Sequence, residues 1–125
     1  ILASECGTPT QLKTAGAILL LEELSEDLYR FDRLLWQLKR AGLLDDLKGV
    51  ILADLVDVAD KGEPAFGQTV EEIVLSHVGS LGVPVVSHFP AGHGDGRVTL
   101  PLGAPARLVA SANSVSLTHE KVFCS

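Results

Sequence analysis

The first 86 residues show a pattern of apolar and polar positions that predicts three strands separated by two helices. Short, continuous aliphatic runs lie at 17–21, 50–53 and 83–86. A run of this length without alternation is typical of a strand that is buried on both faces. The run at 17–21 also follows a glycine and precedes acidic residues, which favours a strand over a buried helix. The expected order of elements is therefore β-α-β-α-β.

Apolar residues between these runs recur at helical spacing. The first predicted helix has Ser25 as its N-cap and ends at Gly42, and its apolar stripe would lie on the sheet. The second begins at Thr69, where the order Thr-Val-Glu-Glu fits a capping box with Glu72. It is expected to stop at Gly82.

After residue 97 the pattern changes to strict alternation. The segments 98–100, 106–109 and 115–118 are separated by turn residues, which predicts short antiparallel strands. The whole pattern therefore indicates an α/β fold with a mixed sheet, two main helices on one side and a C-terminal antiparallel β portion. Residues 1–13 are interpreted as an incoming linker, and 14–125 as the domain itself.

Composition narrows the classes of partner. A chain of 125 residues that is 46% hydrophobic can form one domain with its own core. Its net charge is −6 without a cluster of lysine or arginine, which argues against a nucleic-acid partner because phosphate neutralisation needs a basic face. The longest apolar run is far too short to span a bilayer, so no membrane partner is expected. The sequence contains no methionine, and we therefore expect the chain that begins at Ile1 to be a piece of a larger protein.

Cysteines and most histidines suggest no metal or redox chemistry. Cys6 and Cys124 lie near opposite ends of the chain, without the spacing of zinc ligands or a redox pair. A disulfide between them stays open as an alternative, although free thiols in a reducing, cytoplasmic compartment are the better expectation. His77 is interpreted as a packing residue of the second helix and His119 as a solvated residue, whereas His88 has no assigned role. We expect neither a metal nor an organic cofactor.

Candidate chemistry lies at the ends of two predicted strands. Glu22 directly follows the first aliphatic run, and His93 follows the third within a Gly-His-Gly sequence. In an open α/β sheet, functional side chains gather at the carboxyl ends of the strands, and we expect the two side chains on adjacent strand ends, where the acid can orient the histidine and fix its tautomer. The alternatives are that Glu22 belongs to the solvated start of a helix and that His93 lies by chance in a surface loop.

A nucleophile that would complete such a pair is not found. The sequence contains no G-x-S-x-G turn, and neither Ser80 nor Ser87 lies in a context that would expose an activated hydroxyl. The glycines at 92–96 match neither a phosphate-binding loop nor a dinucleotide fingerprint, and no helix is predicted after them.

Several motifs, in order and spacing, resemble the C-terminal half of the LD-carboxypeptidase family. These are serine peptidases that trim murein tetrapeptides, and the microcin-immunity peptidases belong to the same group. The matching segments are Gly-Thr-Pro at 7–9, and 16–23, 26–42, 83–94 and 99–104. Together they cover nearly the whole chain.

The resemblance implies a two-domain enzyme with a Ser-His-Glu triad in the cleft between its domains. A flavodoxin-like domain would supply the serine, and a small swivelling β/β/α domain, to which this chain corresponds, would supply the acid and the histidine. The family's acid falls on Glu22 and its histidine on His93. The family usually has Glu-Asp where this chain has Glu22-Glu23, a departure that leaves Glu22 intact. The resemblance further implies a murein tetrapeptide or related peptide as substrate, the missing N-terminal domain as partner, and a homodimer.

Two functions from other classes compete with this hypothesis. In the first, His93 would carry a phosphoryl group between distant sites, as in swivelling phosphohistidine domains. In the second, the chain would be a non-catalytic interaction module with an apolar patch exposed for its partner. On the carboxypeptidase hypothesis, the chain by itself is expected to hydrolyse nothing because it lacks the nucleophile.

Overall fold

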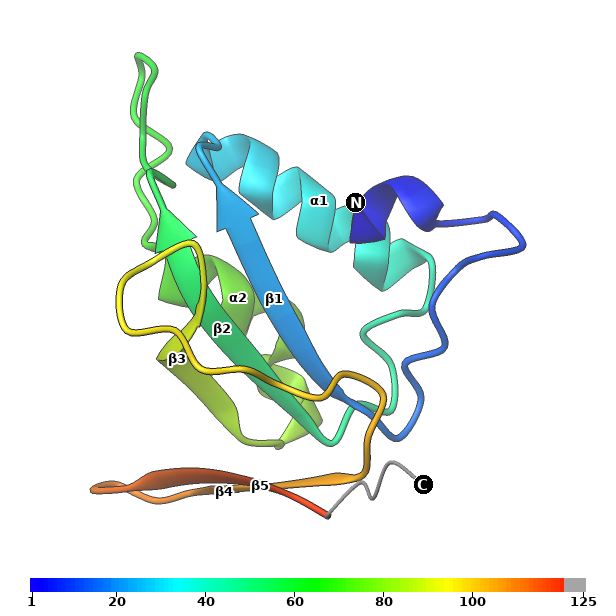
Figure 1. Ribbon diagram of the computed structural model, residues 1–125. Helices are drawn as coiled ribbons and strands as arrows, with labels where there is room; N and C mark the ends of the chain where they lie inside the picture. Colours follow the sequence, from blue (N-terminus) through cyan, green and yellow to red (C-terminus); the bar gives the residue numbers. More distant parts are fainter. Residues whose placement is uncertain (121–125) are drawn as a thin grey trace.

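The computed structural model describes residues 1–120 as an α/β domain with a separate β-hairpin (Figure 1). The elements, in chain order, are the 3₁₀ helix η1 (Leu2–Glu5), strand β1 (Ile18–Leu24), helix α1 (Leu28–Arg40), strand β2 (Gly49–Val56), helix α2 (Val70–Val78), the 3₁₀ helix η2 (Gly79–Leu81), and strands β3 (Val85–Gly92), β4 (Ala106–Ala110) and β5 (Val115–His119). The predicted order β-α-β-α-β is confirmed.

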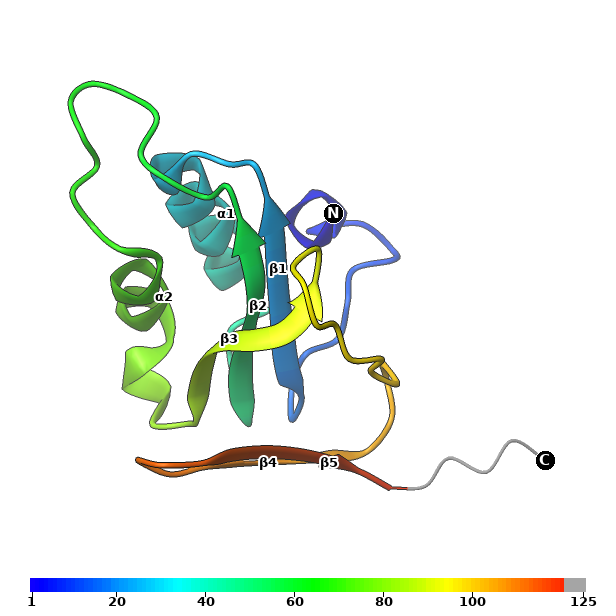
Figure 2. The ribbon, with the colours of Figure 1, turned by 60° about the vertical axis from the view of Figure 1, so that its left-hand side comes forward.

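The three long strands form one parallel sheet in the order β1-β2-β3. Both crossovers run in the same direction, and because such connections are right-handed, α1 and α2 cover the same face of the sheet (Figure 2). The α/β class, the two main helices and the antiparallel C-terminal portion are therefore confirmed.

The antiparallel strands do not join this sheet. β4 and β5 pair only with one another and lie across the edge of the sheet where the parallel strands begin (Figures 1 and 2). The strands thus divide between two sheets instead of forming one mixed sheet. The expected strand at 98–100 is also wrong, since these residues lie outside any strand. Pro101 follows them directly and has no N–H to donate to a ladder.

The core lies between the parallel sheet and its helices. Alternate residues of β1 and β2 face α1 and α2, and the buried aliphatic positions come from all four elements: Leu19, Leu21, Val50, Leu52, Leu35, Leu38, Ile73 and Val74. Because side chains alternate along a strand, residue 22 of β1 faces the opposite side, away from the helices. This alternation leaves one acidic side chain on the open face of the sheet.

The helix ends agree with the sequence at one place and differ at another. The capping box is confirmed, because Thr69 Oγ1 accepts a hydrogen bond from the Glu72 amide and the Glu72 carboxylate accepts one from the Thr69 amide. The predicted N-cap Ser25 is wrong, since Asp27 occupies that position of α1. Ser25 has a φ of 58° and its amide donates to the carbonyl of Val56, so this residue forms the turn after β1 instead.

The ends of the chain leave some predictions open. In the predicted linker 1–13, Ala3 of η1 is buried and its carbonyl accepts a hydrogen bond from the side-chain amide of Gln37 in α1. Cys124 lies outside the described residues, so its relationship to Cys6 stays a prediction. Within residues 1–120, none of the helices has the length and apolar character needed to cross a bilayer.

Candidate active site

Glu22 and His93 meet at the carboxyl edge of the parallel sheet. Glu22 lies within β1, and His93 directly follows the last residue of β3. Nδ1 of His93 is hydrogen-bonded to Oε1 of Glu22. The histidine side chain is 59% exposed and the glutamate side chain 30% exposed. The two residues that the sequence singled out are therefore in direct contact, on a surface open to solvent.

The two residues come from strands that are not neighbours, because β2 lies between β1 and β3. β3 crosses over the end of β2 through an irregular register: Ala53 pairs with Phe89, but Asp54 already pairs with Gly92. The extra residues 90 and 91 bend β3 toward β1 (Figure 2). We expected the two side chains on adjacent strand ends, and it is this bend that brings them together instead.

A second irregularity lies directly opposite the glutamate. Leu21 pairs with Leu52 and Glu23 with Leu55, so two residues of β2, Ala53 and Asp54, face the single residue Glu22. Bulges of this kind increase the local twist and are common beside active sites, where they redirect side chains. The parallel sheet has three irregularities, and these two lie at the edge that holds the candidate site; the third lies between Ile51 and Ala53 of β2, in its pairing with β3.

Two glycines allow the close approach. Gly92 has a φ of 97°, and a Cβ there would lie 2.7 Å from Cγ of Glu22. A Cβ on Gly94 would lie 2.1 Å from Oδ2 of Asp54. Both distances are shorter than carbon and oxygen atoms tolerate, so the segment can occupy this place only because neither position carries a side chain.

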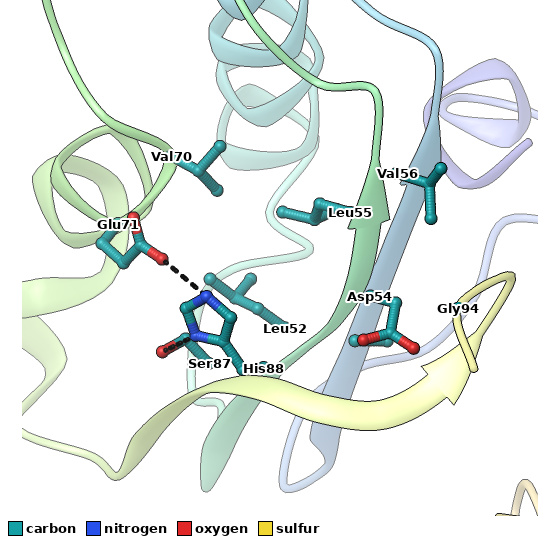
Figure 3. Close-up of a pocket in the computed structure, with 10 residues that line it drawn as sticks. Leu52, Asp54, Leu55, Val56, Val70, Glu71, Ser87, His88 and Gly94 are labelled. Carbon is teal, nitrogen blue, oxygen red and sulfur yellow. Dashed lines mark hydrogen bonds and ion pairs between the residues drawn. The ribbon is translucent and has the colours of Figure 1, made fainter. Parts of the chain in front are cut away.

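Asp54 is a neighbour of the site that sequence reasoning missed. Its Oδ2 is shielded from solvent and has no hydrogen-bond partner among the described residues. Like Glu22, it follows an aliphatic run at the end of a strand, and that shared pattern could have drawn attention to it. Asp54 also lines a cavity of about 280 Å³, together with Gly94 (Figure 3).

The cavity lies between β2, β3 and the first turn of α2, and its polar lining comes from Asp54, Glu71, Ser87 and His88. Nδ1 of His88 is 3.1 Å from the Ser87 hydroxyl, and its Nε2 is 4.0 Å from the Glu71 carboxylate. His88, which had no assigned role, thus lines this cavity and makes no contact with the Glu22–His93 pair.

A second acid–histidine pair has a different character. Nε2 of His77 lies 2.7 Å from Oδ1 of Asp32, and its ring contacts Trp36 edge to face. The His77 side chain is only 1% exposed, so it connects α2 to α1 within the molecule. The prediction of a packing histidine is confirmed. By contrast, His119 is half-buried at the end of β5, where we had expected a solvated residue.

The geometry of the exposed pair defines its chemistry. In the neutral imidazole, a carboxylate that accepts a hydrogen bond from Nδ1–H of His93 fixes the single ring proton there, so that Nε2 is the nitrogen that can accept a proton from a group in solvent or on another domain. In the described part of the chain, no three carboxylate, histidine or cysteine side chains lie close enough to hold a metal ion. An acid–histidine pair of this kind is chemically able to act as a general base with an orienting acid.

Comparisons with known proteins define the class. Residues 1–108 match the profile of the LD-carboxypeptidase C-terminal domain. The chain belongs to the LD-carboxypeptidase family, a family of peptidases, and the resemblance seen in the sequence is confirmed.

Individual relatives and solved structures agree with this assignment. A Streptomyces coelicolor protein provisionally named as a carboxypeptidase is 39% identical over 126 residues, which cover all of this chain and 38% of that protein. The murein tetrapeptide carboxypeptidase of Pseudomonas aeruginosa is 33% identical over 94 residues, covering 75% of this chain and 30% of the relative. The crystal structure of the muramoyltetrapeptide carboxypeptidase from Oxalobacter formigenes superposes with a TM-score of 0.79 at 32% identity, covering 93% of this chain and 40% of that one. The chain therefore spans about two-fifths of the length of such proteins or less.

Proposed function

We propose that this chain supplies the acid and the histidine of a serine-type LD-carboxypeptidase, with Glu22 and His93 as two members of a Ser-His-Glu triad. The observation that carries the proposal is the hydrogen bond between Nδ1 of His93 and Glu22 at an exposed edge of the sheet. The serine would come from a domain outside this chain, as the family resemblance implies. The substrate class, a murein tetrapeptide, is taken from the names of the relatives.

In this mechanism His93 acts twice. Its Nε2 takes the proton of the serine hydroxyl while the serine oxygen bonds to the carbonyl carbon of the L,D-peptide bond. The same proton then goes to the departing amine of the D-amino acid as the C–N bond breaks. Water, deprotonated by His93, then bonds to the acyl carbon, and His93 returns the proton to the serine oxygen as the ester C–O bond breaks. Glu22 holds the imidazole in place throughout and stabilises its cationic form.

The surroundings of His93 also bear on the phosphohistidine alternative. A phosphoryl group on histidine is best supported by a following helix N-terminus. Residues 93–100, which follow β3, form bends and extended loop. No helix N-terminus therefore follows His93 within the described residues, which disfavours the phosphohistidine alternative.

The test is Glu22→Gln in the full-length protein that contains this chain. Serine proteases lose about 10⁴-fold in kcat when the acid no longer orients its histidine, and we expect a loss of that order here. Glu23→Gln is the matched control, since residue 23 points to the other side of the same strand and its carboxylate bonds only the adjacent Leu24 amide. Retention of more than about a tenth of the activity by Glu22→Gln would show that Glu22 is not the triad acid.

A further inference from the structure

We infer that Arg97 is a positioning residue that holds the turn of residues 93–97, the His93 turn, in place for catalysis. This inference rests on the proposed function. Nε of Arg97 donates a hydrogen bond to the carbonyl of Gly94 at 2.6 Å, and its Nη2 donates a longer one to the carbonyl of His93 at 3.4 Å. The two contacts bind consecutive carbonyls. They therefore fix the peptide units on the carboxyl side of His93, directly at the base of its side chain.

The turn needs such a restraint because of its composition. Positions 92, 94 and 96 are glycines, and glycine loses more conformational freedom on ordering than any other residue. The turn is also exposed, with 59% of the His93 side chain accessible to solvent. The close approach to Glu22 and Asp54 thus depends on a segment with little intrinsic stiffness and without an apolar anchor between residues 93 and 97.

Two further contacts act on the same turn. The amide of Val98 donates to the carbonyl of Pro90 at 2.9 Å, which closes the base of the turn, and Nδ1 of His93 bonds Glu22. Neither contact constrains the backbone between His93 and Gly96. Among the hydrogen bonds of the described residues, the two from Arg97 are those that reach this part.

The chemistry of the arginine side chain suits this task. A guanidinium group carries its donors in a rigid, planar fork and stays charged at all working pH values. A lysine ammonium is a single point donor on a flexible stem and cannot reproduce two directed bonds. In the described part of the chain Arg97 forms no ion pair with a carboxylate, so its contacts to the turn are to backbone oxygens.

The experiment compares Arg97→Ala, Arg97→Gln and Arg97→Lys in the full-length protein. Because a misplacement of about 1 Å at a catalytic group can cost about 10²-fold in rate, we expect kcat to fall roughly 10- to 100-fold in the alanine and glutamine variants. KM should stay within about two-fold, since the arginine acts through His93 and not on the substrate. Lysine should restore only part of kcat.

Arg40→Ala is the matched control. Arg40 is an exposed residue in the last turn of α1, and that end of the helix lies at the opposite edge of the sheet from the carboxyl ends of the strands. We expect this variant to keep its kcat. It reports any general effect of removing a surface arginine.

A second arm asks whether Arg97 acts through the Glu22–His93 pair. Arg97→Ala is combined with Glu22→Gln, in which the imidazole is already misoriented. If the arginine positions His93, the second substitution should lower kcat by less than about two-fold further, because residues that act as one unit are strongly non-additive.

Several results would overturn the inference. An unchanged kcat in Arg97→Ala, full additivity with Glu22→Gln, or a rise in KM without loss of kcat would each do so, the last by indicating that the guanidinium binds the substrate. If Arg97→Ala fails to fold, the glutamine and lysine variants decide by the same criteria. Failure of the proposed function is a separate result, namely activity retained by Glu22→Gln itself.

Discussion

Gly92 lies so close to Glu22 that a Cβ at position 92 would stand 2.7 Å from Cγ and 3.3 Å from Oε1 of the glutamate. The glycine is the last residue of β3, and the glutamate belongs to β1. The end of β3, directly before His93, is thus packed against the Glu22 side chain to which His93 is hydrogen-bonded. The lack of a side chain at Gly92 leaves the space that the Glu22 side chain occupies, and the hydrogen bond to His93 orients its carboxylate.

This relationship predicts that Gly92→Ala lowers the proposed carboxypeptidase activity of the full-length protein. The new methyl group would displace the Glu22 side chain and separate its carboxylate from Nδ1 of His93. We expect kcat to fall by about 10² or more, the scale seen when a catalytic group is misplaced by about 1 Å. Steady-state kinetics measures this effect, and urea denaturation measures the accompanying loss of stability.

Gly96→Ala separates the clash from backbone strain. Gly96 also has a positive φ, 74°, but nothing lies within 4 Å of a Cβ at that position. A residue with a side chain costs about 1–3 kcal/mol in this backbone region, so Gly96→Ala should lose about this amount, whereas Gly92→Ala should lose more because of the clash with Glu22. Equal activities in the two variants would mean that the contact with Glu22 has no functional consequence.

How much of this fold could be predicted depends on where the chain follows regular patterns. The aliphatic runs located all three parallel strands, and the Thr69–Glu72 capping box marked the start of α2 correctly. β3 was predicted too short because Phe89-Pro90-Ala91-Gly92 contains two residues that normally interrupt strands. In the molecule these residues form the bend over β2. The proline and glycine therefore mark a bulge within β3 and not the end of the strand.

The candidate site was predictable only in part for a related reason. Glu22 and His93 could be named because each follows an aliphatic run and because both fall on motifs of a known family. Their contact across β2, the buried oxygen of Asp54 and the bonds from Arg97 depend on strand register and on the path of one turn. Neither the register between strands nor the path of a turn can be read from the spacing of residue types along the sequence.

The pair of Asp32 and His77 predicts a difference between two substitutions. Asp32→Ala would leave Nε2–H of the buried His77 without its acceptor, which costs about 1–3 kcal/mol of unfolding free energy. Asp32→Asn keeps an acceptor oxygen in the same place and should cost less than about half of that amount. Urea denaturation of the chain at neutral pH measures both values. Equal losses in the two variants would contradict the expectation that a neutral acceptor oxygen can replace the carboxylate.

A carboxylate directly after β2 gives a pH-dependent prediction. Asp57 Oδ2 accepts hydrogen bonds from Lys61 Nζ at 2.8 Å and from the Ser25 hydroxyl at 2.6 Å. The hydrogen bond from Lys61, then that from Ser25, then the positive charge of Lys61 lower the pKa of Asp57 below its ordinary 3.8. These bonds join the turn after β1 to the turn after β2.

The sign of the effect follows from this lowered pKa. The folded state favours the charged carboxylate, so its contribution to stability is present above the unfolded pKa of 3.8 and is lost as pH falls through the lower folded pKa. Because the Asp57 side chain is more than half exposed, the effect on stability is small, and a carbon NMR titration of its carboxyl group is the direct measurement. We expect a midpoint below 3.8 in the wild-type chain and a return toward 3.8 in Lys61→Met. Lys48→Met, which removes the partner of Asp46 instead, should leave the Asp57 midpoint unchanged, and an equal response to both substitutions would contradict the assignment to Lys61.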